Sequence, residues 1–139
     1  MKADSGEQNE LLFRAREACS RAYAPYSQFP VGAAVADTTG RVFAGCNVEN
    51  ASYGLTQCAE RNAIGAAVAA GVAAGKLAVM LVFTPRSAPT PPCGACRQVM
   101  LEMLAPGAVV ITCNGDGQAR EWPVEGLLPD PFLPKSLGD

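Results

Sequence analysis

Seven apolar residues follow one another at positions 77–83, LAVMLVF, and this stretch decides the fold. A short, continuous apolar run that is rich in branched side chains is typical of a β-strand buried on both faces. Such a strand needs one layer of helices above it and another below it to exclude water. The run therefore predicts the centre of a sheet that helices cover on both sides.

The segments around this strand alternate between helical and extended patterns. Residues 5–23 repeat apolar side chains at helical spacing, whereas 31–36 and 42–46 are short apolar runs joined by a polar turn with a glycine. The expected elements are a helix over 5–23, strands over 31–36 and 42–46, a helix over 57–70, the strand 77–83, a helix over 96–104, a strand over 108–112 and an edge strand over 119–122. This order favours an α/β fold, a three-layer α-β-α sandwich with a central mixed sheet of about five strands.

Length and charge narrow the class of protein. The 139 residues, of which 49% are hydrophobic, are enough for a single domain, residues 1–139, with its own core. The formal net charge is −2 and the 11 basic residues are scattered, so a nucleic-acid partner is not expected. The polar start of the chain, and the absence of an apolar run of about 18 residues, predict a cytoplasmic protein with no membrane partner.

The chain has six cysteines and no histidine, so any site with soft metal ligands must use sulfur. The motifs CAE and PCGAC supply Cys58, Glu60, Cys93 and Cys96, each motif at an expected helix start. Zn²⁺ prefers four sulfur or nitrogen ligands, and a catalytic zinc site keeps one of the four positions open. The three cysteines therefore indicate a catalytic Zn²⁺ site, and Glu60, two residues after the first ligand, is the candidate proton carrier.

The other three cysteines, Cys19, Cys46 and Cys113, lie in apolar segments and are expected to be small buried packing residues. Three disulfides in a secreted fold are the less favoured alternative, because the chain is long for such a scaffold and shows no export signal. A further alternative is that Cys46 or Cys113 provides a fourth ligand. The protein would then be a non-catalytic, zinc-stapled module.

The two cysteine motifs together resemble the signature of zinc deaminases, in which a glutamate follows the first ligand and a Pro-Cys-X-X-Cys pair comes later. The resemblance narrows to the short-chain, typically homotetrameric cytidine deaminases, whose first ligand is cysteine. It covers nearly the whole chain. The motifs that resemble this family are YAPYS at 23–27, FPVGAA at 29–34, GCNVEN at 45–50, CAER at 58–61, PCGACRQ at 92–98 and LLP at 127–129.

This resemblance implies a function and an assembly. The implied reaction is zinc-dependent, hydrolytic deamination of cytidine and 2'-deoxycytidine to uridine and 2'-deoxyuridine, a step of pyrimidine salvage. Glu60 would carry protons from water to ring N3 and to the leaving amine. The implied assembly is a homotetramer in which neighbouring subunits complete each active site. A deaminase of a modified cytosine nucleoside, such as blasticidin S deaminase, is the alternative, because it shares the metal motifs.

The resemblance also assigns residues. The implied substrate contacts are Phe29, Asn47, Glu49, Tyr53, Ala59 and Phe132. Asn47 and Glu49 would bind the ribose hydroxyls, which favours nucleosides over nucleotides, while Tyr53 and Phe132 would reach into a neighbouring subunit's site. Three thiolates leave a zinc centre formally negative. Arg61 and Arg97 are therefore expected to donate hydrogen bonds to the ligand sulfurs and to offset that charge.

Overall fold

The structure of the protein, a computed structural model, describes residues 5–138. Eight regular elements follow the order α1 Ser5–Cys19, β1 Gly32–Asp37, β2 Val42–Cys46, α2 Ala59–Ala69, β3 Leu77–Thr84, α3 Gly94–Met103, β4 Leu104–Asn114 and β5 Ala119–Pro123. Short 3₁₀ helices lie at η1 Tyr53–Leu55, η2 Val124–Leu127 and η3 Pro134–Leu137. Among the described residues, no helix has both the length and the apolar character needed to cross a bilayer.

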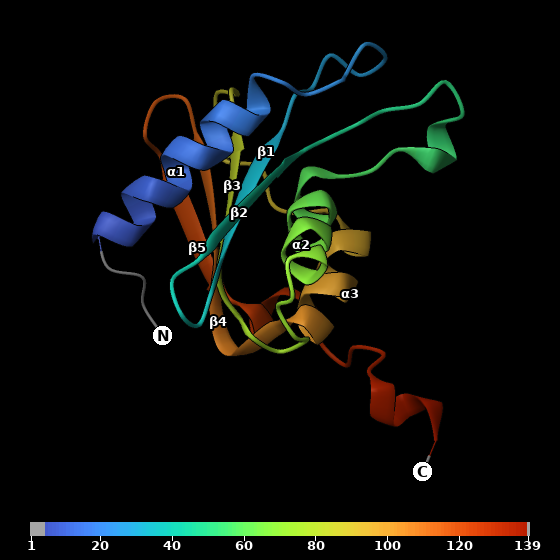
Figure 1. Ribbon diagram of the computed structural model, residues 1–139. Coiled ribbons are helices and arrows are strands. Elements are labelled where there is room, and N and C mark those ends of the chain that lie inside the picture. Colours follow the sequence, from blue (N-terminus) through green and yellow to red (C-terminus); the bar gives the residue numbers. More distant parts are fainter. Residues whose placement is uncertain (1–4, 139) are drawn as a thin grey trace.

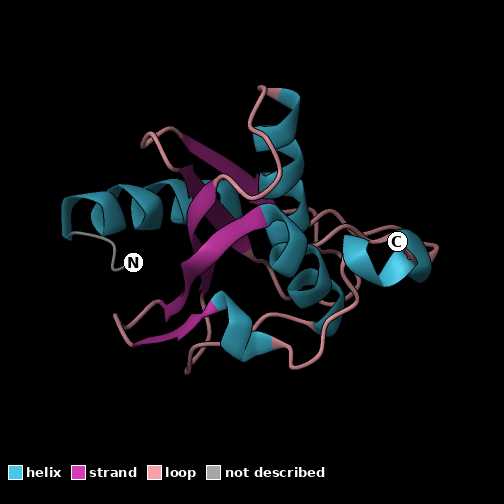
Figure 2. Ribbon diagram, turned by 90° about the horizontal axis from the view of Figure 1, so that it is seen from below, coloured by secondary structure: helices cyan, strands magenta, loops and turns pink. Residues whose placement is uncertain are grey.

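The strands form one mixed sheet with the spatial order β2-β1-β3-β4-β5. The β3–β4 pair is parallel and the other pairs are antiparallel. Helix α1 covers one face of this sheet, and α2 and α3 cover the other (Figures 1 and 2). The predicted α-β-α sandwich is therefore confirmed.

Strand β3 lies at the centre of the sheet, as its apolar run predicts, and all of its residues are buried. Met80 and Val82 pack into the core beneath α2 and α3, whereas Leu81 and Phe83 pack into the core beneath α1. This alternation follows from the period of two in a β-strand, which sends neighbouring side chains to opposite faces. One strand thus anchors both hydrophobic cores.

Several element ends differ from the predicted positions. Helix α1 ends at Cys19 rather than near position 23, and α3 begins at Gly94 rather than at 96. Strand β4 begins at Leu104, so the Pro-Gly pair at 106–107 lies inside its start instead of separating it from the helix. The register between β3 and β4 shifts at this point: Leu77 pairs with Leu104, whereas Val79 pairs with Val109. Proline has no amide donor for the ladder, so the chain bulges at this point.

Two glycines allow the helices to approach the sheet closely. A Cβ on Gly32 would lie 1.8 Å from the carbonyl oxygen of Ala15 in α1. A Cβ on Gly45 would lie 2.5 Å from the amide nitrogen of Ala63 in α2. Both obstacles are backbone atoms, which cannot move without moving the helix. Because Gly45 has no side chain, α2 can lie this close to the sheet, and the residue at position 45 thus fixes the distance between them.

Substituting Gly45 tests this contact. Gly45→Ala should lower the free energy of unfolding by about 1–3 kcal/mol, because the added methyl group must displace α2. Urea denaturation followed by circular dichroism would measure the change. Gly115→Ala is the matched control: a Cβ there would meet no described atom within 4 Å, and the stability should change by no more than about 0.5 kcal/mol. Equal stabilities for the two variants would contradict the close-approach argument.

Candidate metal centre and active site

Two helix starts meet at the carboxyl end of β3, and each begins with a cysteine. Cys58 is the N-cap residue of α2, Cys93 is the N-cap residue of α3, and Cys96 lies in the first turn of α3. Their three sulfur atoms all lie within 4.8 Å of one another. Helices α2 and α3 lie on the same face of the sheet, which brings together motifs that are 34 residues apart in the sequence (Figure 1).

The spacing of these sulfurs fits a zinc ion. The Sγ atoms of Cys58 and Cys93 are 3.8 Å apart. A tetrahedral Zn²⁺ with Zn–S bonds of about 2.3 Å requires sulfur atoms about 3.8 Å apart, which matches this distance. The free amide groups at both helix starts favour negative charge on the cysteines. Cys58, Cys93 and Cys96 are therefore consistent with a zinc site.

The charge around Cys58 favours its thiolate form. Arg61 donates from Nη2 to the Sγ of Cys58 at 3.2 Å. A hydrogen bond from Cys96, with the Arg61 guanidinium acting in the same direction, lowers the pKa of Cys58 to about 5 despite its partial burial. The same hydrogen bond and burial raise the pKa of Cys96. The contact expected between Arg61 and a candidate ligand sulfur is thus present.

Arg97 lies beside the cluster but makes different contacts from the ones predicted. Its Nε donates to the carbonyl oxygen of Pro92 at 2.8 Å, and its Nη1 donates to that of Leu127 at 2.9 Å. Both of these hydrogen bonds go to backbone and not to sulfur. Arg97 therefore ties η2 to the residue that precedes Cys93, and this holds the second cysteine motif in place.

A cavity of about 170 Å³ opens beside the sulfur cluster. Its walls include Cys58, Cys93, Ala59 and Glu60. Glu60 is only 5% exposed, and this burial raises the pKa of its carboxyl group above the ordinary value. A carboxyl group with a raised pKa exchanges protons more readily near neutral pH, as a general acid and base must. The cavity therefore combines two cysteines of the sulfur cluster with a buried carboxyl group.

Phe29 and Asn47, two of the residues expected from the resemblance to contact substrate, line the same cavity. The side-chain amide of Asn47 donates to the carbonyl oxygen of Phe29 at 2.9 Å and accepts from the amide of Val31 at 2.8 Å. An amide side chain has two donor hydrogens and two acceptor lone pairs. These contacts use one of each, so Asn47 fixes the wall around Phe29 and keeps one donor and one acceptor position for another partner.

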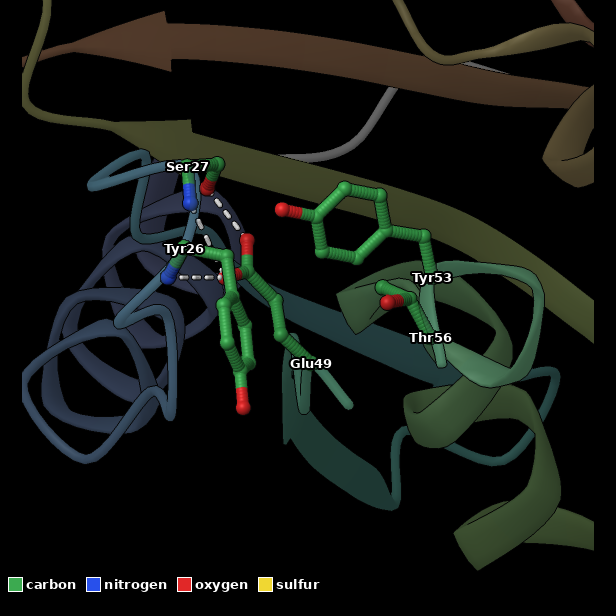
Figure 3. Close-up of a pocket in the computed structure, with 5 residues that line it drawn as sticks. All are labelled: Tyr26, Ser27, Glu49, Tyr53 and Thr56. Atoms are coloured by element: carbon green, nitrogen blue, oxygen red, sulfur yellow. Dashed lines mark hydrogen bonds between the residues drawn. The ribbon is translucent and has the colours of Figure 1, made fainter. Parts of the chain in front are cut away.

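Glu49 lies in a second cavity of about 200 Å³, together with Tyr26, Ser27, Tyr53 and Thr56 (Figure 3). The amides of Tyr26 and Ser27 donate to one carboxylate oxygen at 2.9 and 3.1 Å, and the Ser27 hydroxyl donates to the other. The Ser27 hydroxyl bond, aided by the two amides and opposed by desolvation, lowers the pKa of Glu49. Thr56 lines both cavities, so the two are neighbours.

Two predicted contacts lie away from the cluster cavity. Tyr53 is 73% exposed, and its ring packs at 5.7 Å from that of Tyr26. Phe132 is 58% exposed and lies in the C-terminal segment that projects past α3, where its carbonyl oxygen accepts from Gln98 (Figure 1). Neither side chain is among the residues that line the cavity beside Glu60.

Several residues of the cavity wall were not predicted from the sequence. They are Val31, Thr56, Val82, Thr84, Thr90 and Pro91. Val82 and Thr84 point to the same face because they are two positions apart in β3. Because every residue of the run 77–83 is apolar, the sequence alone does not indicate which of its side chains face the cavity. A polar residue directly after such a run, at the end of a central strand, was the available signal for Thr84.

The remaining cysteines do not join the cluster. Within residues 5–138, the group of potential metal ligands contains Cys58, Cys93 and Cys96 alone. Cys113 packs in the core beneath α1, on the opposite face of the sheet. Its burial raises the pKa of its thiol, as expected for a packing residue. The zinc-stapled alternative with a fourth cysteine ligand is therefore not favoured.

Comparisons with known proteins agree with this geometry. Residues 5–113 match the cytidine and deoxycytidylate deaminase zinc-binding region. The chain is 41% identical over 128 residues to the cytidine deaminase of Sporosarcina psychrophila, covering 92% of this chain and 93% of that protein. It is 43% identical over 129 residues to that of Halalkalibacterium halodurans, covering 93% and 96%.

A solved structure shows the same architecture. The crystal structure of cytidine deaminase from Burkholderia pseudomallei matches with a TM-score of 0.85 and 49% identity, over 89% of this chain and 98% of that one. The fold and the sulfur cluster, together with these similarities, define an enzyme of the zinc-dependent deaminase class. The chain belongs to the cytidine and deoxycytidylate deaminase family.

Metal analysis of two cysteine variants tests the zinc centre. Cys93→Ala should reduce bound zinc from about one ion per chain to a small fraction, because two sulfurs cannot complete the site. Cys113→Ala, on the other face of the sheet, should keep the wild-type zinc content even if it loses some stability. Inductively coupled plasma mass spectrometry of the purified variants would give both values. Full zinc occupancy in Cys93→Ala would exclude this cysteine as a ligand.

Proposed function

We propose that the protein catalyses the hydrolytic deamination of cytidine and 2'-deoxycytidine to uridine and 2'-deoxyuridine. The observation that carries this proposal is that the buried carboxyl group of Glu60 lines the same cavity as the Cys58 and Cys93 sulfurs. The relatives are named cytidine deaminase, so a modified cytosine nucleoside is the less favoured substrate. The reaction adds water at C4 of the pyrimidine, breaks the bond from C4 to the exocyclic nitrogen and releases ammonia.

The protein's own contribution to this chemistry is proton transfer in a confined space. Cys58, Cys93 and Cys96 would hold Zn²⁺, and the bound ion would lower the pKa of a water towards neutrality. Glu60 takes one proton of the attacking water and passes it to ring N3. It then takes the remaining proton from the C4 hydroxyl group and delivers it to the departing amine, so both protons of the water are used. A buried carboxyl group with a raised pKa is suited to both accepting and donating. Arg61 offsets the negative charge of the thiolates through its bond to Cys58.

The substrate contacts follow from the two neighbouring cavities. Phe29, Asn47 and Ala59 would surround the nucleoside beside the metal cluster. Glu49 would accept from the ribose hydroxyls at the adjoining cavity, with Asn47 offering its remaining donor and acceptor. An ionised carboxylate beside the sugar repels a phosphate group. This arrangement supports a nucleoside, rather than a nucleotide, as the substrate.

The assembly proposed for this reaction is a homotetramer whose neighbouring subunits complete each active site. The cavity beside Glu60 measures about 170 Å³, whereas small-molecule sites usually enclose about 300–1,000 Å³. Tyr53 and Phe132 are exposed aromatic side chains on projecting segments and are candidates to enter a neighbour's site (Figure 1). We further propose one domain over residues 1–139, a cytoplasmic location, and a role in pyrimidine salvage without nucleic-acid or membrane partners.

The ultraviolet spectrum of cytidine mixed with the purified, zinc-loaded protein tests the proposed function. Wild type should convert cytidine to uridine. Glu60→Gln should lower kcat by about 10²- to 10⁴-fold, because it removes the proton carrier but keeps the shape of the side chain. Zinc analysis of the same samples separates this effect from metal loss. A wild-type protein that carries zinc but leaves cytidine unchanged would refute the proposal.

A second substitution tests the proposed sugar contact. Glu49→Gln should raise the KM for cytidine by about tenfold or more, because a charged hydrogen-bond acceptor is lost, while the zinc content stays unchanged. The pKa of Glu49 is held below its ordinary value, so the wild-type carboxylate stays ionised as the pH falls from 8 towards 5. The KM difference should therefore persist over that range. Steady-state kinetics at several pH values would measure it, and equal KM values would remove Glu49 from the binding site.

A further inference from the structure

Arg86 lies just outside the cavity and stacks on one of its walls. Its guanidinium carbon is 4.1 Å from the centroid of the Phe29 ring, and its Nη2 donates to the carbonyl oxygen of Gln28 at 3.3 Å. Phe29 lines the cavity beside Glu60, whereas Arg86 is exposed and does not line it. Arg86 therefore covers the Phe29 ring from outside the cavity wall.

The backbone of Phe29 is already held by two other side chains. Its amide donates to the hydroxyl oxygen of Ser27 at 3.0 Å, and its carbonyl oxygen accepts from Asn47 at 2.9 Å. Gln28, the residue before it, has a φ of 54°, a left-handed conformation that is costly for a residue with a side chain. These contacts fix the main chain, but they do not fix the ring. Among the described residues, the stacking partner found for the ring is Arg86.

Arg86 also connects two parts of the cavity wall. It follows β3 in the segment 85–93, and this segment supplies Thr90, Pro91 and Cys93 to the wall. Phe29 comes from the separate segment between α1 and β1. The guanidinium thus bridges two loops that meet at the cavity, one of which carries a candidate metal ligand. Movement of either loop would change the width of the cavity.

We propose that Arg86 is a positioning residue that sets the affinity for the nucleoside by holding the Phe29 ring against the cavity. The inference rests on the proposed function and adds a residue to it. Arg86 acts through Phe29 and needs no contact with the substrate. A guanidinium is planar and can stack on the ring while it donates to the Gln28 carbonyl, which an ammonium group does less well.

Three arginine variants test this role. Arg86→Ala should raise the KM for cytidine by about three- to tenfold, the range expected from loss of one stacked cation and one hydrogen bond, while kcat falls by a smaller factor. Arg86→Lys keeps the charge but loses the planar stack, so its KM should lie between those of wild type and Arg86→Ala. Arg120→Ala is the matched control, because Arg120 stacks on Trp122 at 4.7 Å in β5, away from the cavity wall.

Binding of uridine, measured by isothermal titration calorimetry with the zinc-loaded proteins, provides a readout apart from turnover. The Kd for uridine should rise in Arg86→Ala by a factor similar to that of the KM and should stay at the wild-type value in Arg120→Ala. If Arg86 had a purely structural role, Arg86→Ala would show a lower melting temperature and a lower zinc content. Its KM would then change by no larger a factor than its kcat. If Arg86→Ala does not fold, the same KM and Kd measurements on Arg86→Lys test the proposal.

Failure of the proposed function and failure of the proposed role of Arg86 would give different results. Absence of cytidine turnover by the wild type would overturn the proposed function itself. Turnover by the wild type, with KM and uridine Kd of the folded Arg86 variants equal to those of Arg120→Ala, would overturn only the role of Arg86.

Discussion

The convergence of two helix starts on one group of sulfur atoms is the constraint on which the rest of the site depends. Each helix start offers unpaired amide donors and a partial positive charge, and each places a cysteine at its N-cap position. Three thiolates this close together repel one another unless positive charge balances them. The helix starts, Arg61 and a zinc ion provide that balance. The fold therefore places the three sulfurs at the position where positive charge can stabilise them.

The positions of both helices depend in turn on the sheet. Strand β3 is buried on both faces, and its carboxyl end directs the chain into the segment that leads to Cys93. On the edge strand β2, the missing side chain at Gly45 lets α2 approach the sheet to within backbone contact distance. The depth of α2 decides where Cys58 and Glu60 lie relative to Cys93. A packing contact in the sheet thereby controls the geometry of a site at the end of the helix.

The side of the site that carries Phe29 and Glu49 is built in a different way. Its wall comes largely from irregular segments, which have no ladder or helix to hold their backbone. Side chains take over this role: Asn47 and Ser27 hold the main chain at Phe29, and the backbone amides around Ser27 hold the carboxylate of Glu49. Polar residues that would be read as substrate contacts are thus also the structural supports of the loops. Helices hold the side that carries the cysteines, whereas these hydrogen bonds hold the side that carries Phe29 and Glu49.

The sequence by itself determined the layered fold and the cysteine cluster with Glu60 beside it, because each depends on short-range patterns. The apolar run at 77–83 indicates a strand buried on both faces, and the spacing of the CAE and PCGAC motifs indicates a zinc site with Glu60 beside it. Only the tertiary structure decided that Arg97 bonds to backbone carbonyls, that Val82 and Thr84 face the cavity, and that Arg86 stacks on Phe29. These contacts join segments far apart in the chain through side chains in loops, and loop positions follow from packing rather than from any periodic pattern.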